Sequence, residues 1–182
     1  MNAPTQTRLR FLCTPLLAID PHRTQMYFQT LAMYDTLKYR FSDIPEPDWT
    51  DVLDVIKRMG QSMYLIEDST TGQIVAEFAL ENWTGRACQS HFSTVPTTDI
   101  TSAERIEIGR QAIAHMFSLT HPETGEPILD ALYGLTPLSN RAACIFALKI
   151  GYKKQGILPS GILVDDKPMD CMISVCSRKE MN

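Results

Sequence analysis

The stretch TPLSNRAACIFALKIGYKKQGILP, residues 136–159, carries the clearest structural pattern in the chain. Asn140 stands where a helix N-cap is expected, because an Asn side chain can accept a hydrogen bond from an amide of the first turn. Small and apolar residues then recur at helical spacing, and Gly151 is a typical helix stop. We therefore expect a helix over 140–150 that packs closely on another element. Its predicted inner stripe consists of Ala142, Ala143, Phe146, Ala147 and Ile150.

Composition limits the classes of protein to consider. The chain has 182 residues, 44% of them hydrophobic and 21% charged, which is ordinary for a globular domain. A net charge of -4 and the absence of a long basic run argue against nucleic-acid binding. No apolar run approaches the roughly 18 residues of a membrane span, and the N-terminus lacks the apolar segment of a signal peptide. We expect a cytoplasmic protein that binds neither membrane nor nucleic acid.

The cysteines and histidines show no metal-binding spacing. Five cysteines without a CxxC pair argue against a disulfide framework or a zinc site, and the four histidines form no HExxH motif. We expect reduced thiols, several of them in the core, and no metal. The cysteines are Cys13, Cys88, Cys144, Cys171 and Cys176.

Hydrophobic periodicity predicts the order β α α β β β α β α β β in a single domain over 1–182. Residues 1–60 supply the first strand and two helices, and 61–182 supply the rest. This is an α/β (α+β) domain with a mixed central sheet of about seven strands and four main helices. The predicted strands span 8–19, 62–68, 73–82, 86–96, 128–136, 152–158 and 168–177, and the predicted helices span 20–37, 48–60, 101–119 and 140–150.

Local signals support these assignments. Pro15 favours an edge position for the first strand, because proline cannot donate to a central ladder. Gly72 stands between two strand-like runs and predicts a hairpin. Thr101 and Glu104 have the spacing of a capping box at the start of the third helix.

Residues 128–175 resemble the C-terminal half of the GNAT acetyltransferase superfamily, and most closely the branch that acetylates protein N-termini and ribosomal proteins. In that branch an Asn and small residues open a helix, a K-x-G-F segment ends it, and G-x-L and D-G-K-x-x-D segments follow. The positions that match are Asn140, Ala142, Lys149, Gly151, Tyr152, Gly156, Leu158, Lys167 and Asp170.

The resemblance implies a GNAT-like fold and acetyl-CoA as co-substrate. It implies that the fourth and fifth strands part near Val95 and Thr136 to hold the pantetheine arm, that Thr94 and Val95 bind the cofactor, and that Asn140 contacts it. A plain N-cap role for Asn140 stays open beside this interpretation. The family's phosphate-binding Q/R-x-x-G-x-G/A motif is altered.

Only Gly109 of residues 104–109 matches that motif. Glu104 and Glu107 would repel a pyrophosphate, unless they only stabilise the positive helix N-terminus. In that case Arg105 and Arg110 are the candidates to hold phosphate.

The catalytic positions are altered as well. The Glu that the branch uses as a base on its fourth strand corresponds to Gln89, and an amide cannot accept the proton. We therefore expect His91 to act as the base, with Glu77 or Glu81 on the third strand beside the cleft. The alternatives are a hydrogen-bonded buried imidazole and solvated carboxylates on an exposed sheet face.

Three functions follow from these observations. The first is an acetyl-CoA-dependent N-acetyltransferase that acts on a small amine or a protein N-terminus. The second is a catalytically inactive binding or assembly protein, such as a phage virion or head-assembly component, which the altered motifs and a resemblance to phage-encoded acetyltransferase-like proteins favour. Its aromatic and Met-rich first helix would dock a partner or a second copy. The third is an acyl-CoA binder without turnover. The first-helix residues concerned are Met26, Tyr27, Phe28, Met33, Tyr34 and Tyr39.

Overall fold

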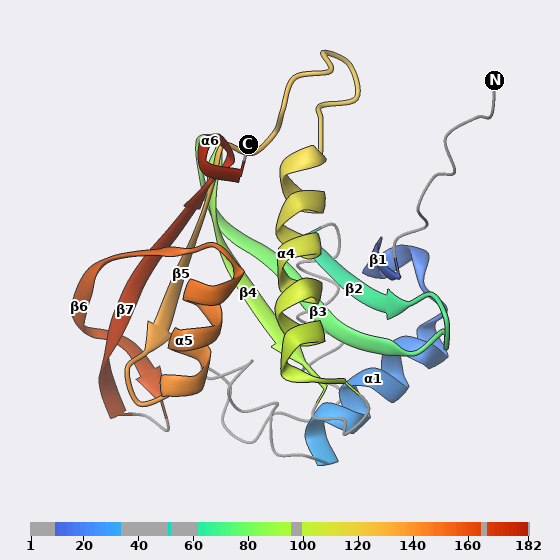
Figure 1. The fold of residues 1–182 in the computed structure, drawn as a ribbon, viewed down its shortest axis with the longest axis horizontal. Helices are drawn as coiled ribbons and strands as arrows, with labels where there is room; N and C mark the ends of the chain where they lie inside the picture. The colour runs from blue at the N-terminus through green and yellow to red at the C-terminus, as the bar shows by residue number, and fades with distance from the viewer. Residues whose placement is uncertain (1–9, 34–50, 52–61, 96–99, 165–166, 182) are drawn as a thin grey trace.

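Seven strands form one mixed sheet in the order β1-β2-β3-β4-β5-β7-β6 (Figure 1). The computed structural model describes residues 10–33, 51, 62–95, 100–164 and 167–181. All neighbouring strands are antiparallel except β4 and β5, which are parallel. The strands are β1 (Phe11–Pro15), β2 (Met63–Asp68), β3 (Ile74–Thr84), β4 (Ala87–Thr94), β5 (Ala131–Pro137), β6 (Lys153–Val164) and β7 (Lys167–Ser177).

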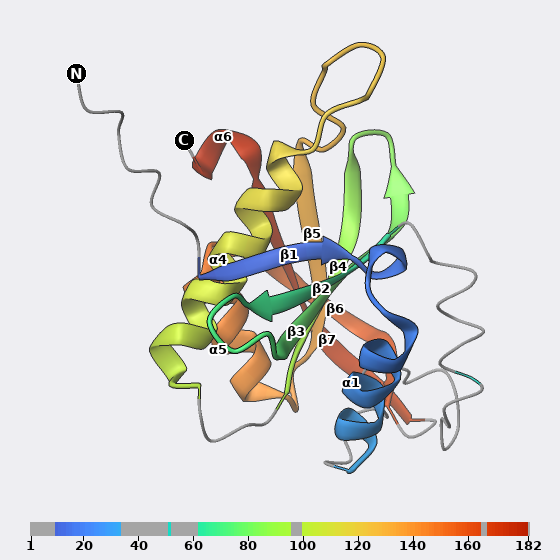
Figure 2. The same cartoon turned by 90° about the vertical axis from the view of Figure 1, so that its right-hand side faces the viewer.

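Helices cover both faces of the sheet. Figure 2 shows α1 on one face and α4 and α5 on the other. The described helices are α1 (Pro21–Met33), α4 (Ser102–Ser118), α5 (Arg141–Ile150) and the short α6 (Arg178–Met181), with a 3-10 turn at Leu16–Ala18. Among the described residues, no helix has the length and apolar character to cross a bilayer.

The predicted fold is confirmed. The sheet has seven strands, and Pro15 ends an edge strand as expected. The helix predicted at 48–60 lies outside the described residues except for Asp51. The strand predicted at 152–158 continues to Val164, because a register shift between Leu158 and Ile162 lets β6 pair with β7 beyond Pro159.

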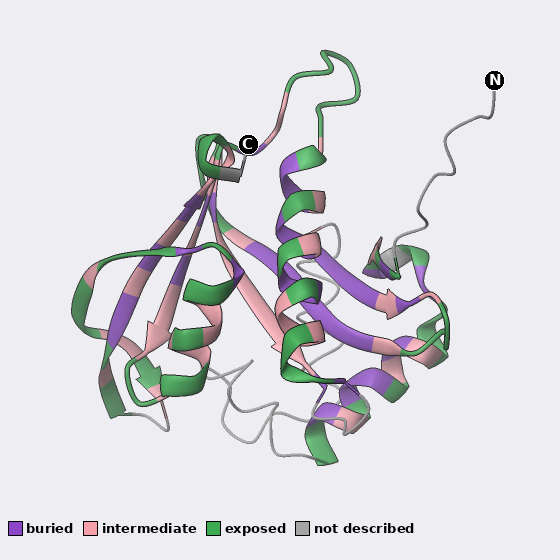
Figure 3. Ribbon diagram, viewed as in Figure 1, coloured by how far each residue is buried: buried purple, intermediate pink, exposed green. Residues whose placement is uncertain are grey.

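The core lies on the two faces of the sheet (Figure 3). Residues of β3, β4 and β5 pack against α4 on one face, where Phe78, Ile108 and Ile113 are fully buried. The smaller cluster lies beneath α1 on the other face. All five cysteines are free thiols, as predicted.

The first helix divides between the core and the surface. Tyr27 and Phe28 are buried in the cluster beneath α1. Met26 is 55% exposed and Met33 is 85% exposed. Tyr34 and Tyr39 lie outside the described residues. Of the four described residues of this aromatic and Met-rich set, two therefore belong to the core and two lie on the surface.

The two parallel strands separate. Residues 87–89 of β4 pair with residues 131–133 of β5, and the pairing ends there. Both strands continue, β4 to Thr94 and β5 to Pro137, and Figure 1 shows them diverging. Meanwhile β5 stays paired with β7 along its whole length. The parting of the fourth and fifth strands that the family resemblance implied is present, and it begins after Gln89 and Tyr133, earlier than expected.

Candidate functional site

A groove of about 440 Å³ lies beside the diverging end of β4, between α4 and α5. This volume falls in the range of ligand pockets, roughly 300–1,000 Å³. The groove is mostly apolar, with basic side chains from both helices. It is lined by Phe92, Thr94, Ser102, Arg105, Ile106, Ala142, Ala143, Ile145, Phe146 and Lys149.

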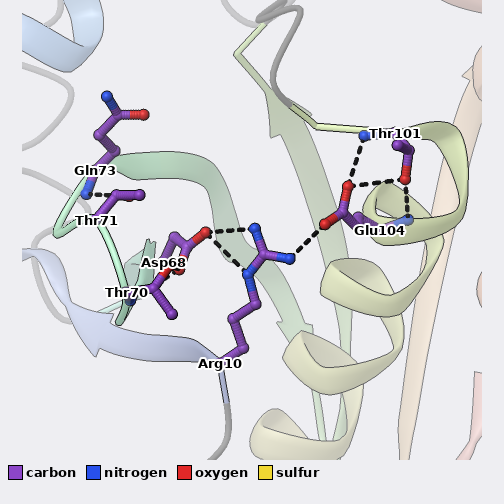
Figure 4. Close-up of polar contacts among 7 residues, drawn as sticks. All are labelled: Arg10, Asp68, Thr70, Thr71, Gln73, Thr101 and Glu104. Atoms are coloured by element: carbon purple, nitrogen blue, oxygen red, sulfur yellow. Dashed lines mark hydrogen bonds and ion pairs between the residues drawn. The ribbon is translucent and has the colours of Figure 1, made fainter.

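The start of α4 is held by the predicted capping box (Figure 4). The Glu104 carboxylate accepts hydrogen bonds from the Thr101 amide and hydroxyl, each at 2.8 Å. It also pairs with the Arg10 guanidinium. These bonds, those from Thr101 first, lower the pKa of Glu104 to about 2. The carboxylate is thus charged and already neutralised by a cation.

Neither glutamate of α4 lines the groove. Glu104 turns to Thr101 and Arg10, and Glu107 is exposed and accepts a hydrogen bond from Gln111. The repulsion that these carboxylates would exert on a phosphate is therefore much reduced. Glu104 lies in the first turn of α4, where it stabilises the positive helix N-terminus, which is the alternative to repulsion given for it above.

The two predicted phosphate-binding arginines form hydrogen bonds to elements that neighbour α4. Arg105 lines the groove, and its Nη1 donates to Thr94 Oγ1 and to the Val95 carbonyl, both at 3.1 Å. The guanidinium of Arg110 donates to the Lys149 carbonyl near the end of α5. Both arginines therefore tie helix α4 to the neighbouring elements.

Gly109 lies in the interior of α4, so its amide belongs to the helix ladder. A Cβ added there would stand 2.7 Å from Ile150 Cγ2 and 3.0 Å from Phe146 Cζ. The residue lets α4 approach α5 closely. This packing is the role that the structure gives to the one glycine retained from the phosphate-binding motif.

Asn140 is the N-cap of α5. Its Oδ1 accepts a hydrogen bond of 3.1 Å from the Ala143 amide, and Gly151 ends the helix in the left-handed conformation at φ 119°. The N-cap alternative for Asn140 is thus correct. A contact between its amide NH2 group and a cofactor remains a prediction.

Val95 is buried at the end of β4 on the α1 side. Its amide donates to the Val75 carbonyl, and its own carbonyl accepts from Arg105. Both backbone groups of Val95 are therefore engaged within the protein. Thr94, its neighbour, lines the groove on the other face.

The predicted base lies on the sheet face opposite the groove. His91 is aligned with Ala79 of β3, whose side chain belongs to the core beneath α1. His91 Nε2 lies 2.5 Å from Glu81 Oε1, and each side chain is 29% exposed. Glu77, by contrast, is fully buried. The alternative of a solvated carboxylate is therefore wrong for Glu77, because the α1 side of the sheet is covered at that point. A catalytic role for Glu77 beside the cleft remains a prediction.

Comparison with known proteins finds similarity in structure only. The sequence matches no protein-family profile, and it matches no curated protein. Among solved structures, the fold is similar to that of spermidine N-acetyltransferase from Vibrio cholerae in complex with CoA and spermine. The TM-score is 0.72 at 11% identity, over 94% of this chain and 98% of that chain.

Two further structures have the same fold. Ribosomal-protein-S5-alanine acetyltransferase from Vibrio fischeri gives a TM-score of 0.63 at 11% identity, over 96% of this chain and 97% of that one. A GNAT-family acetyltransferase from Bacillus anthracis gives 0.58 at 14% identity, over 75% and 77%. The chain therefore has the GNAT fold.

Only Thr94 and Arg105 of the ten described residues that line the groove were among the predicted site residues. The charged residues that the prediction missed are Lys149 in the groove and Arg10 beside Glu104. Lys149 was only a match to the family pattern, yet it lines the groove opposite Arg105. Arg10 carried no signal at all, because its partner Glu104 is 94 positions away in the sequence. The spacing of Lys149 from Asn140 on a predicted helix was the one signal that pointed to Lys149.

Proposed function

We propose that the protein is an acetyl-CoA-dependent N-acetyltransferase that acts on an amine. The observation that supports this most is the gap between β4 and β5. On one face of the sheet it borders the groove between α4 and α5, and on the other face lies the His91–Glu81 pair. Two substrates can therefore approach one point from opposite faces.

The groove has the chemistry to hold acetyl-CoA. The apolar walls and the β4 backbone that has lost its partner strand suit the pantetheine arm. Arg105 and Lys149 offer positive charge for the phosphates. The N-terminus of α4 adds its positive potential, and Asn140 lies at the start of the opposite helix. The glutamates of α4 do not line this groove, so the altered motif does not prevent binding.

His91 and Glu81 would prepare the acceptor. The Glu81 carboxylate lies against Nε2 of the imidazole, so Nδ1 would be the nitrogen that takes a proton from the ammonium form of the acceptor. Backbone amides of β4 at the gap would polarise the carbonyl of the acyl group. Bound acetyl-CoA supplies an acetyl thioester as the activated group.

In the balanced reaction, the amine nitrogen forms a bond to the carbonyl carbon and the carbon–sulfur bond breaks. The sulfur takes up the proton that the nitrogen loses, which gives an amide and CoA thiol. No oxidant or reductant is needed. The named neighbours act on spermidine and on a ribosomal-protein alanine, so the acceptor here belongs among polyamines, other small amines and protein N-termini.

Thermal unfolding with CoA and with acetyl-CoA tests the proposal. A ligand that binds the native state raises the melting temperature by mass action. Release of thiol should then follow when spermidine, a panel of small amines or peptides with a free N-terminus are added. If the melting temperature does not change at millimolar cofactor, a catalytically inactive protein with the same fold is favoured. A shift without thiol release for any amine would favour an acyl-CoA binder.

A further inference from the structure

A second, smaller cavity of about 90 Å³ lies inside the gap between β4 and β5. Ser90 and Phe92 of β4 and Gly134 and Thr136 of β5 all line it. Ser90 and Gly134 directly follow the last pair, Gln89 and Tyr133, and Phe92 and Thr136 lie two residues further along their strands. Helix α5 covers the cavity through Phe146 and Ala147.

The cavity adjoins the groove. Phe92, Ala143 and Phe146 line both spaces. The rings of Phe92 and Phe146 stack between them, with centroids 5.0 Å apart and planes inclined by 23°. A group that extends from the groove past this stacked pair would therefore enter the cavity.

A buried hydroxyl lines the cavity. Ser174 of β7 is fully buried, and its Oγ has no hydrogen-bond partner among the described residues. The hydroxyl of Ser90, in the same cavity, is by contrast satisfied by Tyr152 Oη at 2.6 Å and the Tyr133 carbonyl at 3.2 Å. Buried polar side chains are generally paired, so an unpaired hydroxyl at a cavity is a position where an enclosed polar group can form a hydrogen bond.

The space beside Ser174 depends on Gly134. The two residues are direct neighbours across β5 and β7, and a Cβ added at Gly134 would stand 3.3 Å from Ser174 Oγ. Gly134 is buried within a strand, and its φ is not positive, so the backbone does not require glycine. Glycine weakens a strand interior and often marks the close approach of a ligand.

We propose that this cavity is an acyl pocket, and that beside acetyl-CoA the protein accepts, and binds more tightly, a slightly longer acyl-CoA whose acyl chain carries an oxygen near its end. This inference rests on the proposed function. The rings of Phe78, Phe92 and Phe146 contact the chain, and the Ser174 hydroxyl binds the oxygen. About 90 Å³ accommodates roughly three atoms beyond the acetyl group, at ~30 Å³ for each water-sized group.

The lining also restricts the charge of the acyl group. None of the residues that line the cavity carries a charge at neutral pH. An ionised acyl group such as succinyl would be buried without a counter-charge, which is strongly unfavourable. A neutral hydroxyacyl group, for example 3-hydroxybutyryl, matches the lining.

The test is the binding of CoA, acetyl-CoA, butyryl-CoA and 3-hydroxybutyryl-CoA to the full chain, measured by calorimetry. In the wild type, butyryl-CoA should bind about tenfold more tightly than acetyl-CoA, because its two added methylenes enter an apolar pocket. The 3-hydroxybutyryl thioester should bind more tightly still. Gly134→Ala should abolish both preferences and leave the affinity for CoA unchanged.

Ser174→Ala removes the hydroxyl and keeps the volume of the cavity, so it distinguishes the contribution of the hydroxyl from that of the cavity volume. It should keep the preference for butyryl-CoA and lose the gain from the 3-hydroxyl group, and it does not depend on whether Gly134→Ala folds. If CoA binds but all three acyl thioesters bind equally to the wild type, the acyl pocket is rejected while the proposed function stands. If CoA and all its thioesters fail to bind, the proposed function is rejected, and the acyl pocket with it.

Discussion

Glu81 and His91 form a carboxylate–imidazole pair across β3 and β4, with 2.5 Å between Glu81 Oε1 and His91 Nε2. The two strands are joined by a tight hairpin. Gln89, two residues before His91 on β4, lies directly opposite Glu81 on β3. In the proposed reaction the Glu81–His91 pair would take the place of the carboxylate that the resembling branch has at position 89.

His91→Ala should lower kcat by about 100-fold or more, the usual contribution of general acid–base catalysis, and change KM for the acyl-CoA little. Glu81→Gln should give a smaller loss and change the pH dependence of kcat, because the carboxylate that orients the imidazole is gone. Steady-state thiol release over a pH series measures both. His22→Ala, an exposed histidine on α1, is the control and should behave as the wild type. If kcat is unchanged in His91→Ala, the assignment of His91 as the general base is rejected.

The ion pairs of Arg10 with Asp68 and Glu104 predict how the stability of the fold depends on pH. Hydrogen bonds from Arg10 and Thr70 lower the pKa of Asp68 to about 2, and those from Thr101 and Arg10 lower the pKa of Glu104 to about 2. Because both folded-state values lie below the ordinary 3.8 and 4.5, the stabilisation is complete above pH 4.5. It is lost as the pH falls from there toward 2.

Arg10→Met should therefore destabilise the protein at pH 7, and its difference from the wild type should shrink as the pH falls through this window. Thermal unfolding at a series of pH values measures the difference. Arg86→Met is the matched control, since the Arg86–Asp130 pair is exposed on both sides and such pairs contribute little. A difference for Arg10→Met that stays constant from pH 7 to 2 would contradict the assignment.

The close approach of α4 and α5 predicts a cost for any side chain at Gly109. Gly109→Ala places a methyl group 2.7 Å from Ile150 Cγ2, and such overpacking costs typically 1–3 kcal/mol of unfolding free energy. Gly156→Ala is the control, because nothing lies within 4 Å of an added Cβ there. Denaturant unfolding without ligand measures both. Equal stability of the two variants would show that Gly109 is not a packing residue.

Local sequence signals predicted much of the fold correctly. The capping box of Thr101 and Glu104, the N-cap Asn140 and the left-handed stop at Gly151 depend on residues within a few positions of one another. The hairpin at Gly72, which has φ 70°, is equally local. Such signals can be recognised from the sequence alone, because both partners of each interaction lie within a few residues of each other.

The candidate site depends on contacts between distant segments. Glu77 and Glu81 point to the same face of β3, as the alternation of the strand predicts. That face is covered at Glu77, which is buried, whereas Glu81 is partly exposed and lies beside His91. The approach of Gly134 to Ser174 depends on β7 inserting between β5 and β6. Periodicity identifies the face on which a side chain lies, and it does not identify what covers that face.

Asn140 combines a structural role that is observed with a cofactor role that is proposed, and two substitutions separate them. Asn140→Ala removes the cap bond to the Ala143 amide and should cost about 1 kcal/mol of stability. Asn140→Ser keeps a capping oxygen and should cost much less. Both remove the amide NH2 group, so both should weaken the CoA-induced rise in melting temperature if that group contacts the cofactor. Equal CoA-induced shifts in Asn140→Ser and the wild type would leave Asn140 as a helix cap alone. In that case the polar contacts of the pantetheine arm would have to come from the β4 backbone, because that is where the sheet has lost its partner strand.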